Sequence, residues 1–158
     1  TVHQWVDVFT RPIYVDGLME SFIYCQKHKG LEVFAWVVMS NHLHLIVRAK
    51  NGDLSDIIRD FKKFTAKSIY KTIADNPKES RKDWLLKVLS HEGRIWFWQE
   101  GYHGEEIFSM DFYHTKVNYI HMNPVRAGIV EKEEEYINSS AGEFYGVRKS
   151  RLELSKYG

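Results

Sequence analysis

Residues 31–49, Leu-Glu-Val-Phe-Ala-Trp-Val-Val-Met-Ser-Asn-His-Leu-His-Leu-Ile-Val-Arg-Ala, carry the pattern from which the fold can be worked out. The run from Val33 to Val38 is apolar and rich in β-branched and aromatic side chains, which predicts a largely buried strand over 31–39. Ser40-Asn41 is a candidate tight turn, and the following residues predict a second strand as far as about Ala49. The stretch therefore predicts a β-hairpin at the centre of the protein.

Patterns typical of helices and strands lie on both sides of this hairpin in the sequence. The expected helices cover about residues 15–28, 54–74, 78–89 and 110–123, and the expected strands outside the hairpin cover 1–10 and 95–102. Pro124 is expected to end the last helix. The order strand, helix, strand, strand, helix, strand, helix predicts an α+β fold of the ferredoxin-like class. Such a fold has an antiparallel sheet with helices on one face, here with a short helical insertion.

Length and composition favour one compact domain over residues 1–158, with about 131–158 as a charged C-terminal tail. The chain has 158 residues, of which 44% are hydrophobic and 15% aromatic. Its 22 basic and 21 acidic residues nearly cancel, so a nucleic-acid surface has to be a local patch. The single cysteine, Cys25, excludes an internal disulfide framework and suits a reducing cytosol. No membrane-spanning run or signal peptide is recognisable, and we expect a cytoplasmic protein.

His42 and His44 flank one apolar residue at the start of the second strand of the hairpin. Side chains alternate along a strand, so both imidazoles point to the same face. Two imidazoles on one face are half of a metal site. The spacing alone leaves ordinary hydrogen-bonded or exposed histidines open as the alternative.

A second group of polar side chains lies near the end of the last expected helix. Tyr119 and Asn123 are four residues apart and project from the same helix face. A tyrosine with an ordinary pKa of about 10 needs a cation or a base nearby to act as a nucleophile. The alternative is a half-buried helix tyrosine with a packing role.

The order of these motifs resembles that of the IS200-like Y1 transposases, and within them the branch of REP-associated tyrosine transposases. The resemblance rests on Val-Val-Met-Ser-Asn-His-Leu-His-Leu-Ile-Val (37–47), the segment 54–70, Tyr-Ile-His-Met-Asn-Pro-Val-Arg-Ala-Gly (119–128) and Tyr-Ile-Asn-Ser-Ser (136–140). It covers nearly the whole chain. Family members usually have a longer first strand, which begins before the position of Thr1. This difference concerns the edge of the expected sheet and not the catalytic site.

The resemblance implies a metal-dependent, single-stranded DNA endonuclease and strand transferase that acts on hairpin-bearing DNA. His42 and His44 match the pair that binds a divalent metal, Mg²⁺ or Mn²⁺. Tyr119 matches the catalytic tyrosine, which attacks a DNA phosphate and forms a covalent 5′-phosphotyrosine. Asn123 corresponds to the polar residue that completes the metal site. The implied setting is the cytoplasm of a prokaryote, at the nucleoid.

Basic residues suggest where DNA would bind. The candidates for phosphate contacts are Arg59, Lys62, Lys63, Lys67 and Arg126. The first four lie on the expected helix 54–74, where Arg59, Lys63 and Lys67 form a stripe and Phe61 and Phe64 are expected to face the core. A plain solvated helix face is the alternative. Trp96, Trp98 and Tyr102 could stack unpaired bases, although the tryptophans equally suit the core.

Two other function classes remain open at this point. A domesticated relative would bind a DNA hairpin without cleaving it. A metal-dependent phosphoesterase would use the same histidines to activate water and would not need Tyr119. For the endonuclease and for the domesticated relative, the expected partner is single-stranded or hairpin DNA. A homodimer is possible.

Overall fold

The predicted hairpin is the centre of the structure. A computed structural model describes all of residues 1–158. Strands β1 (Leu31–Val38) and β2 (Leu43–Ala49) pair antiparallel, with Val37 opposite His44 and Val38 opposite Leu43. A register shift between Val33 and Ala35 places one extra residue, Phe34, in β1.

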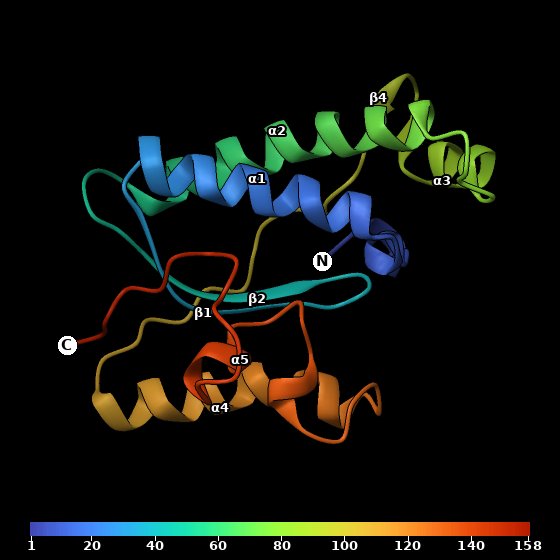
Figure 1. The fold of residues 1–158 in the computed structure, drawn as a ribbon. Coiled ribbons are helices and arrows are strands. Elements are labelled where there is room, and N and C mark those ends of the chain that lie inside the picture. Colours follow the sequence, from blue (N-terminus) through green and yellow to red (C-terminus); the bar gives the residue numbers. More distant parts are fainter.

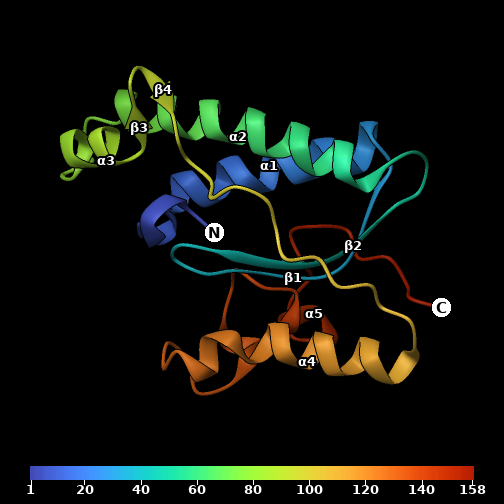
Figure 2. The same ribbon diagram turned by 180° about the vertical axis from the view of Figure 1, so that it is seen from behind.

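Helices cover both faces of this hairpin. Helices α1 (Pro12–His28) and α2 (Leu54–Asp75) lie on one face, and α4 (Met110–Arg126) and α5 (Ala141–Phe144) lie on the other (Figures 1 and 2). The α+β class agrees with the sequence analysis, but the expectation of helices on one face is corrected. The reason lies in β1, which is apolar on both sides: Trp36 belongs to the core under α1 and α2, and Val37 to the core under α4. A strand apolar on both faces has to be covered on both.

The expected outer strands are mostly irregular. Residues 1–10 form two 3-10 turns, His3–Trp5 and Val8–Thr10, because a positive φ at Gln4 and Trp5 interrupts the extended backbone. In the expected strand 95–102, only the two-residue β4 (Arg94–Ile95) pairs, with β3 (Ser90–His91). A single bridge joins Val2 to Trp98. Around this bridge the His3 amide donates to the Phe97 carbonyl at 2.8 Å and the Gln99 amide donates to the Thr1 carbonyl at 2.9 Å, and the Phe97 side chain is buried.

The expected helices are present with shifted ends. The insertion helix, α3 (Lys82–Val88), is shorter than expected. Helix α4 begins at an N-cap in which Ser109 accepts from the Phe112 amide, and it continues past Pro124 to Arg126. The proline lies in the last turn, where the loss of one amide donor is tolerated, and Gly128 then ends the helix with a φ of 73°. None of the helices is long and apolar enough to cross a bilayer.

The segment after residue 131 is folded onto the sheet. Trp36 donates its backbone N–H to Ser140 Oγ at 2.9 Å, and the Ser140 amide donates to the Trp36 carbonyl at 3.0 Å. Further along, the Ser155 amide donates to the Val33 carbonyl. This segment therefore occupies the edge of β1 that β2 leaves free.

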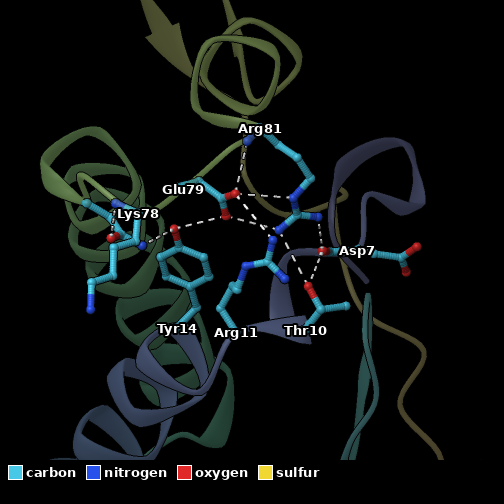
Figure 3. Close-up of polar contacts among 8 residues, drawn as sticks. Asp7, Thr10, Arg11, Tyr14, Lys78, Glu79 and Arg81 are labelled. Atoms are coloured by element: carbon cyan, nitrogen blue, oxygen red, sulfur yellow. Dashed lines mark hydrogen bonds and ion pairs between the residues drawn. The ribbon is translucent and has the colours of Figure 1, made fainter.

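A buried carboxylate fixes the beginning of α1 to the connection between α2 and α3 (Figure 3). Glu79 accepts hydrogen bonds from Tyr14 Oη at 3.1 Å and from the Arg81 guanidinium at 3.0 Å, while Arg11 lies 3.8 Å away. Arg81 also donates to the Asp7 carbonyl at 2.8 Å. Burial alone would raise the pKa of Glu79, but the hydrogen bonds from Arg81 and Tyr14 outweigh it and lower that pKa. The cluster thereby holds the N-terminal segment in place.

Candidate active site

The two histidines lie on the face of the hairpin that α4 covers. Their ring centroids are 5.1 Å apart, and the ring of His44 lies 5.7 Å from the ring of Tyr119 on α4. His42 comes directly after the Ser40-Asn41 turn, and His44 is the second residue of β2. The two motifs that the sequence places 75 residues apart are thus neighbours in space.

The turn before the histidines is held by the N-terminal segment. The Val2 amide donates to the Asn41 carbonyl and the Phe9 amide to the Ser40 carbonyl, each at 2.8 Å. Within the hairpin, the Met39 amide donates to the His42 carbonyl at 2.8 Å. The backbone that carries His42 is therefore fixed from both sides.

Both imidazoles are neutral at pH 7. Burial lowers the pKa of His44 to about 4, with a smaller contribution from His42, and burial also lowers the pKa of His42. A neutral imidazole has a lone pair that can bind a cation, so the pair is in the state that metal binding requires. His42 Nδ1 is occupied by a 2.8 Å contact with Asn41 Oδ1, which leaves Nε2 for a ligand.

Two cationic side chains lie close to the ring of Tyr119. Its side chain is half exposed on α4, and the Arg126 guanidinium lies 4.4 Å from the ring centroid. Arg126 also donates to the Tyr119 carbonyl at 2.7 Å. The ammonium of Lys116 lies 5.9 Å from the same ring and pairs with Glu105 at 3.0 Å. Positive charge at this position attracts an anionic phosphate.

Asn123 lies one turn after Tyr119, but its amide is turned back onto the helix. Nδ2 donates to the Tyr119 carbonyl at 3.2 Å, which leaves Oδ1 as the atom available to a cation. No group of three or more His, Cys, Asp or Glu side chains could hold a metal ion. Two neutral imidazoles and one amide oxygen fit a divalent ion whose other ligands come from water or phosphate.

The basic residues predicted to contact DNA do not form one patch. Lys63 and Lys67 are exposed and unpaired on α2, whereas Arg59 pairs with Asp56 and Asp60 at 2.8 and 3.1 Å. Lys62 donates to two backbone carbonyls, those of Gln99 and Gly101. Burial lowers the pKa of Lys62.

Arg126 is separated from this group, because α2 and α4 lie on opposite faces of the sheet (Figure 2). Phe61 is buried as expected, but Phe64 is 64% exposed, which corrects the expectation that it faces the core. The buried side of α2 follows Phe61, Thr65 and Ile69 at spacings of four, and Phe64 falls beside Lys63 and Lys67 instead.

The aromatic residues predicted to stack bases differ in their surroundings. Trp98 is partly buried and donates Nε1 to Thr65 Oγ1 at 3.0 Å, so it belongs to the packing of the domain. Trp96 and Tyr102 are both about half exposed.

Three residues near the site were not singled out from the sequence. Lys116 is three residues before Tyr119, and helical spacing alone would have found it. Asn41 precedes the first histidine and contacts it. The Trp5 ring lies 5.9 Å from the His42 ring, edge to face. No sequence pattern signals this last contact across 37 positions.

Comparisons with known proteins agree with the predicted family. Residues 4–123 match the family described as "Transposase IS200 like". A solved structure of a REP-associated tyrosine transposase bound to a REP hairpin superposes with a TM-score of 0.65. The match covers 98% of this chain and 82% of that chain at 20% sequence identity, which shows a shared fold. No curated protein sequence matches the chain. Because the family match spans most of the sequence and includes both the histidine pair and Tyr119, the chain belongs to the IS200-like transposase family.

Proposed function

We propose that this protein cleaves and rejoins single-stranded DNA beside a hairpin, with Tyr119 as the nucleophile. The observation that carries the proposal is the 5.7 Å approach of the Tyr119 and His44 rings, which joins a candidate nucleophile to a pair of neutral imidazoles. The hairpin as substrate is supported by the similar structure, which holds a REP hairpin.

In the cleavage step, the Tyr119 oxygen attacks a DNA phosphorus and the bond from phosphorus to the 3′ oxygen breaks. The phenol proton leaves, a proton is gained by the departing 3′ oxygen, and a 5′-phosphotyrosine remains. A 3′-hydroxyl from a second strand reverses the step and restores the phenol. The number of phosphoester bonds is unchanged throughout, so no nucleotide cofactor is consumed.

His42 and His44 would hold a divalent cation, Mg²⁺ or Mn²⁺, with the amide oxygen of Asn123 as a further ligand. When bound, such a cation polarises the phosphate and stabilises charge on the departing oxygen. Arg126 supplies a second positive charge next to Tyr119.

Lys63 and Lys67 are the best candidates on α2 for contacts to the DNA backbone, because both are exposed and neither is neutralised by a carboxylate. Arg59 and Lys62 are weaker candidates, since their charged groups already have partners within the protein. Phe64 lies between the two lysines in sequence and offers an exposed ring for stacking.

The test uses a labelled hairpin oligonucleotide with a single-stranded extension, incubated with Mn²⁺ and analysed on a denaturing gel. We expect the protein to form a covalent adduct with the DNA and Tyr119→Phe to bind the hairpin without forming one. Tyr24→Phe removes an exposed hydroxyl from α1 and is the matched control. An adduct in Tyr119→Phe would refute the assignment.

The same assay separates the alternatives. A relative that binds hairpins without cleavage would form no adduct at all. A phosphoesterase would release free DNA ends and would cleave equally well after Tyr119→Phe.

A further inference from the structure

The side-chain amide of Asn41 bridges the N-terminal turn and the first histidine of the pair. Its Nδ2 donates to the Trp5 carbonyl at 3.1 Å, and its Oδ1 lies 2.8 Å from His42 Nδ1. One side chain thus contacts a backbone acceptor on one side and an imidazole on the other.

These two contacts determine where the proton of the His42 ring resides. A carbonyl oxygen only accepts hydrogen bonds, so the Trp5 carbonyl requires the NH₂ end of the amide to face it. The amide oxygen then faces His42, and because this oxygen also only accepts, Nδ1 must carry the hydrogen. A neutral imidazole has one N–H, so the lone pair is on Nε2.

The Trp5 carbonyl is itself held in place. Gln4 and Trp5 have φ values of 53° and 55°, a conformation that non-glycine residues rarely adopt. The Trp5 amide donates to the Val2 carbonyl at 3.0 Å, and the Val2 amide donates to the Asn41 carbonyl at 2.8 Å. These hydrogen bonds fix the Trp5 carbonyl next to Asn41, and a flip of the Asn41 amide would place its oxygen against that carbonyl oxygen, where no hydrogen bond can form.

We propose that Asn41 is a positioning residue that selects the Nδ1–H tautomer of His42 and so presents Nε2 to the cation. The proposal rests on the metal-binding role of the histidine pair in the proposed function. Partners of this kind, which bind the second nitrogen of a ligating imidazole, orient the ring and hold its tautomer. Asn41 therefore acts through His42 and touches neither DNA nor cation.

The direct test is the tautomer of His42 in the metal-free protein at pH 7.5, measured by long-range ¹H–¹⁵N NMR correlations of its ring. We expect Nδ1–H in the wild type and in Asn41→Asp, which keeps an acceptor, and a shift toward Nε2–H in Asn41→Leu. Observation of Nε2–H at His42 in the wild type would overturn the proposal without reference to any variant.

A second readout is Mn²⁺ affinity, followed by electron paramagnetic resonance of free Mn²⁺. We expect Asn41→Leu to bind about 10- to 100-fold more weakly than the wild type and Asn41→Asp to stay within a few-fold of it or bind more tightly. Asn51→Leu, in the exposed loop after β2, is the matched control and should bind as the wild type does. The ring signals of buried His121 report whether each variant is folded.

The outcomes distinguish this inference from the proposed function. Wild-type affinity in a folded Asn41→Leu, or no Mn²⁺ binding by the wild type, refutes the role of Asn41 whatever the DNA assay shows. Conversely, the expected tautomer and affinities, together with no adduct on hairpin DNA, would refute the proposed cleavage and leave Asn41 as the positioning residue of a metal site.

Discussion

The guanidinium of Arg126 lies 4.4 Å from the centre of the Tyr119 ring and donates a 2.7 Å hydrogen bond to the carbonyl of the same residue. The two residues are seven positions apart, so they lie two helical turns from each other on α4. The contact places a permanent positive charge beside the proposed nucleophile.

Replacement of this charge should slow cleavage. We expect Arg126→Gln to reduce the single-turnover rate of adduct formation by about 100-fold, because a group that stabilises charge in the transition state is lost. Arg126→Lys should recover only part of the rate, since an ammonium lacks the planar fork of a guanidinium. Arg151→Gln, which removes an exposed arginine paired with Asp16, is the control. An unchanged rate in Arg126→Gln would exclude a role for Arg126 in the chemical step.

Lys63 and Lys67 should set part of the salt dependence of hairpin binding. The logarithm of the association constant falls with the logarithm of the salt concentration, and each phosphate contact steepens this slope by about 0.9. The double variant Lys63→Gln with Lys67→Gln should therefore have a slope that is shallower by about 1.8. Filter binding or fluorescence anisotropy at several salt concentrations measures it. Lys71→Gln is the control, because Lys71 pairs with Asp75 on the same helix. If the double variant keeps the wild-type slope, the DNA does not pass along this face of α2.

Buried His121 should make the fold sensitive to mild acid. Burial lowers its pKa to about 4, and its Nε2 lies 2.7 Å from Ser140 Oγ. In the unfolded chain the same ring takes up a proton near pH 6.5, so acid favours the unfolded chain. Stability should therefore fall as the pH drops from about 6.5 toward 4, by on the order of 3 kcal/mol in full.

Urea unfolding of the wild type and His121→Gln at pH 7 and pH 5 measures this effect. The variant should be less stable at pH 7 but should lose less stability between the two values. Equal losses in the two proteins would show that other groups cause the acid sensitivity.

Glu79 should be a large single contribution to stability. Glu79→Gln leaves the Arg81 guanidinium with a neutral partner in a buried cluster, and we expect a loss of about 3 kcal/mol in the free energy of unfolding. Since the pKa of Glu79 is lowered in the fold, its contribution is present above about pH 4.5 and is lost as the pH falls through the lower, folded value.

The control for this prediction is Glu92→Gln on the exposed β3–β4 turn, which should change stability by less than about 0.5 kcal/mol. Similar values for the two variants at pH 7 would mean that the buried cluster adds nothing beyond an ordinary surface contact.

Local patterns in the sequence accounted for the hairpin, the longest helices and the two motifs that meet at the site. Alternation along a strand places His42 and His44 on one face, and helical spacing does the same for Tyr119 and Asn123, because both are properties of short stretches; the roles of these residues came from the resemblance to the transposase family. The ferredoxin-like pattern predicts one covered face, whereas β1 is apolar on both sides, with Trp36 in one core and Val37 in the other. The role of Asn41 depends on the backbone conformation of Trp5, which no pattern of residue types specifies.

The segment that pairs with Trp36 and Val33 has a consequence for self-association. An uncovered strand edge is a template on which another chain can add a strand. With residues 138–140 and 155 hydrogen-bonded along β1, two copies cannot join their hairpins through that strand unless the segment first detaches. The C-terminal residues therefore compete with a second copy for the β1 edge, and a homodimer of this protein would have to form through a surface other than that edge.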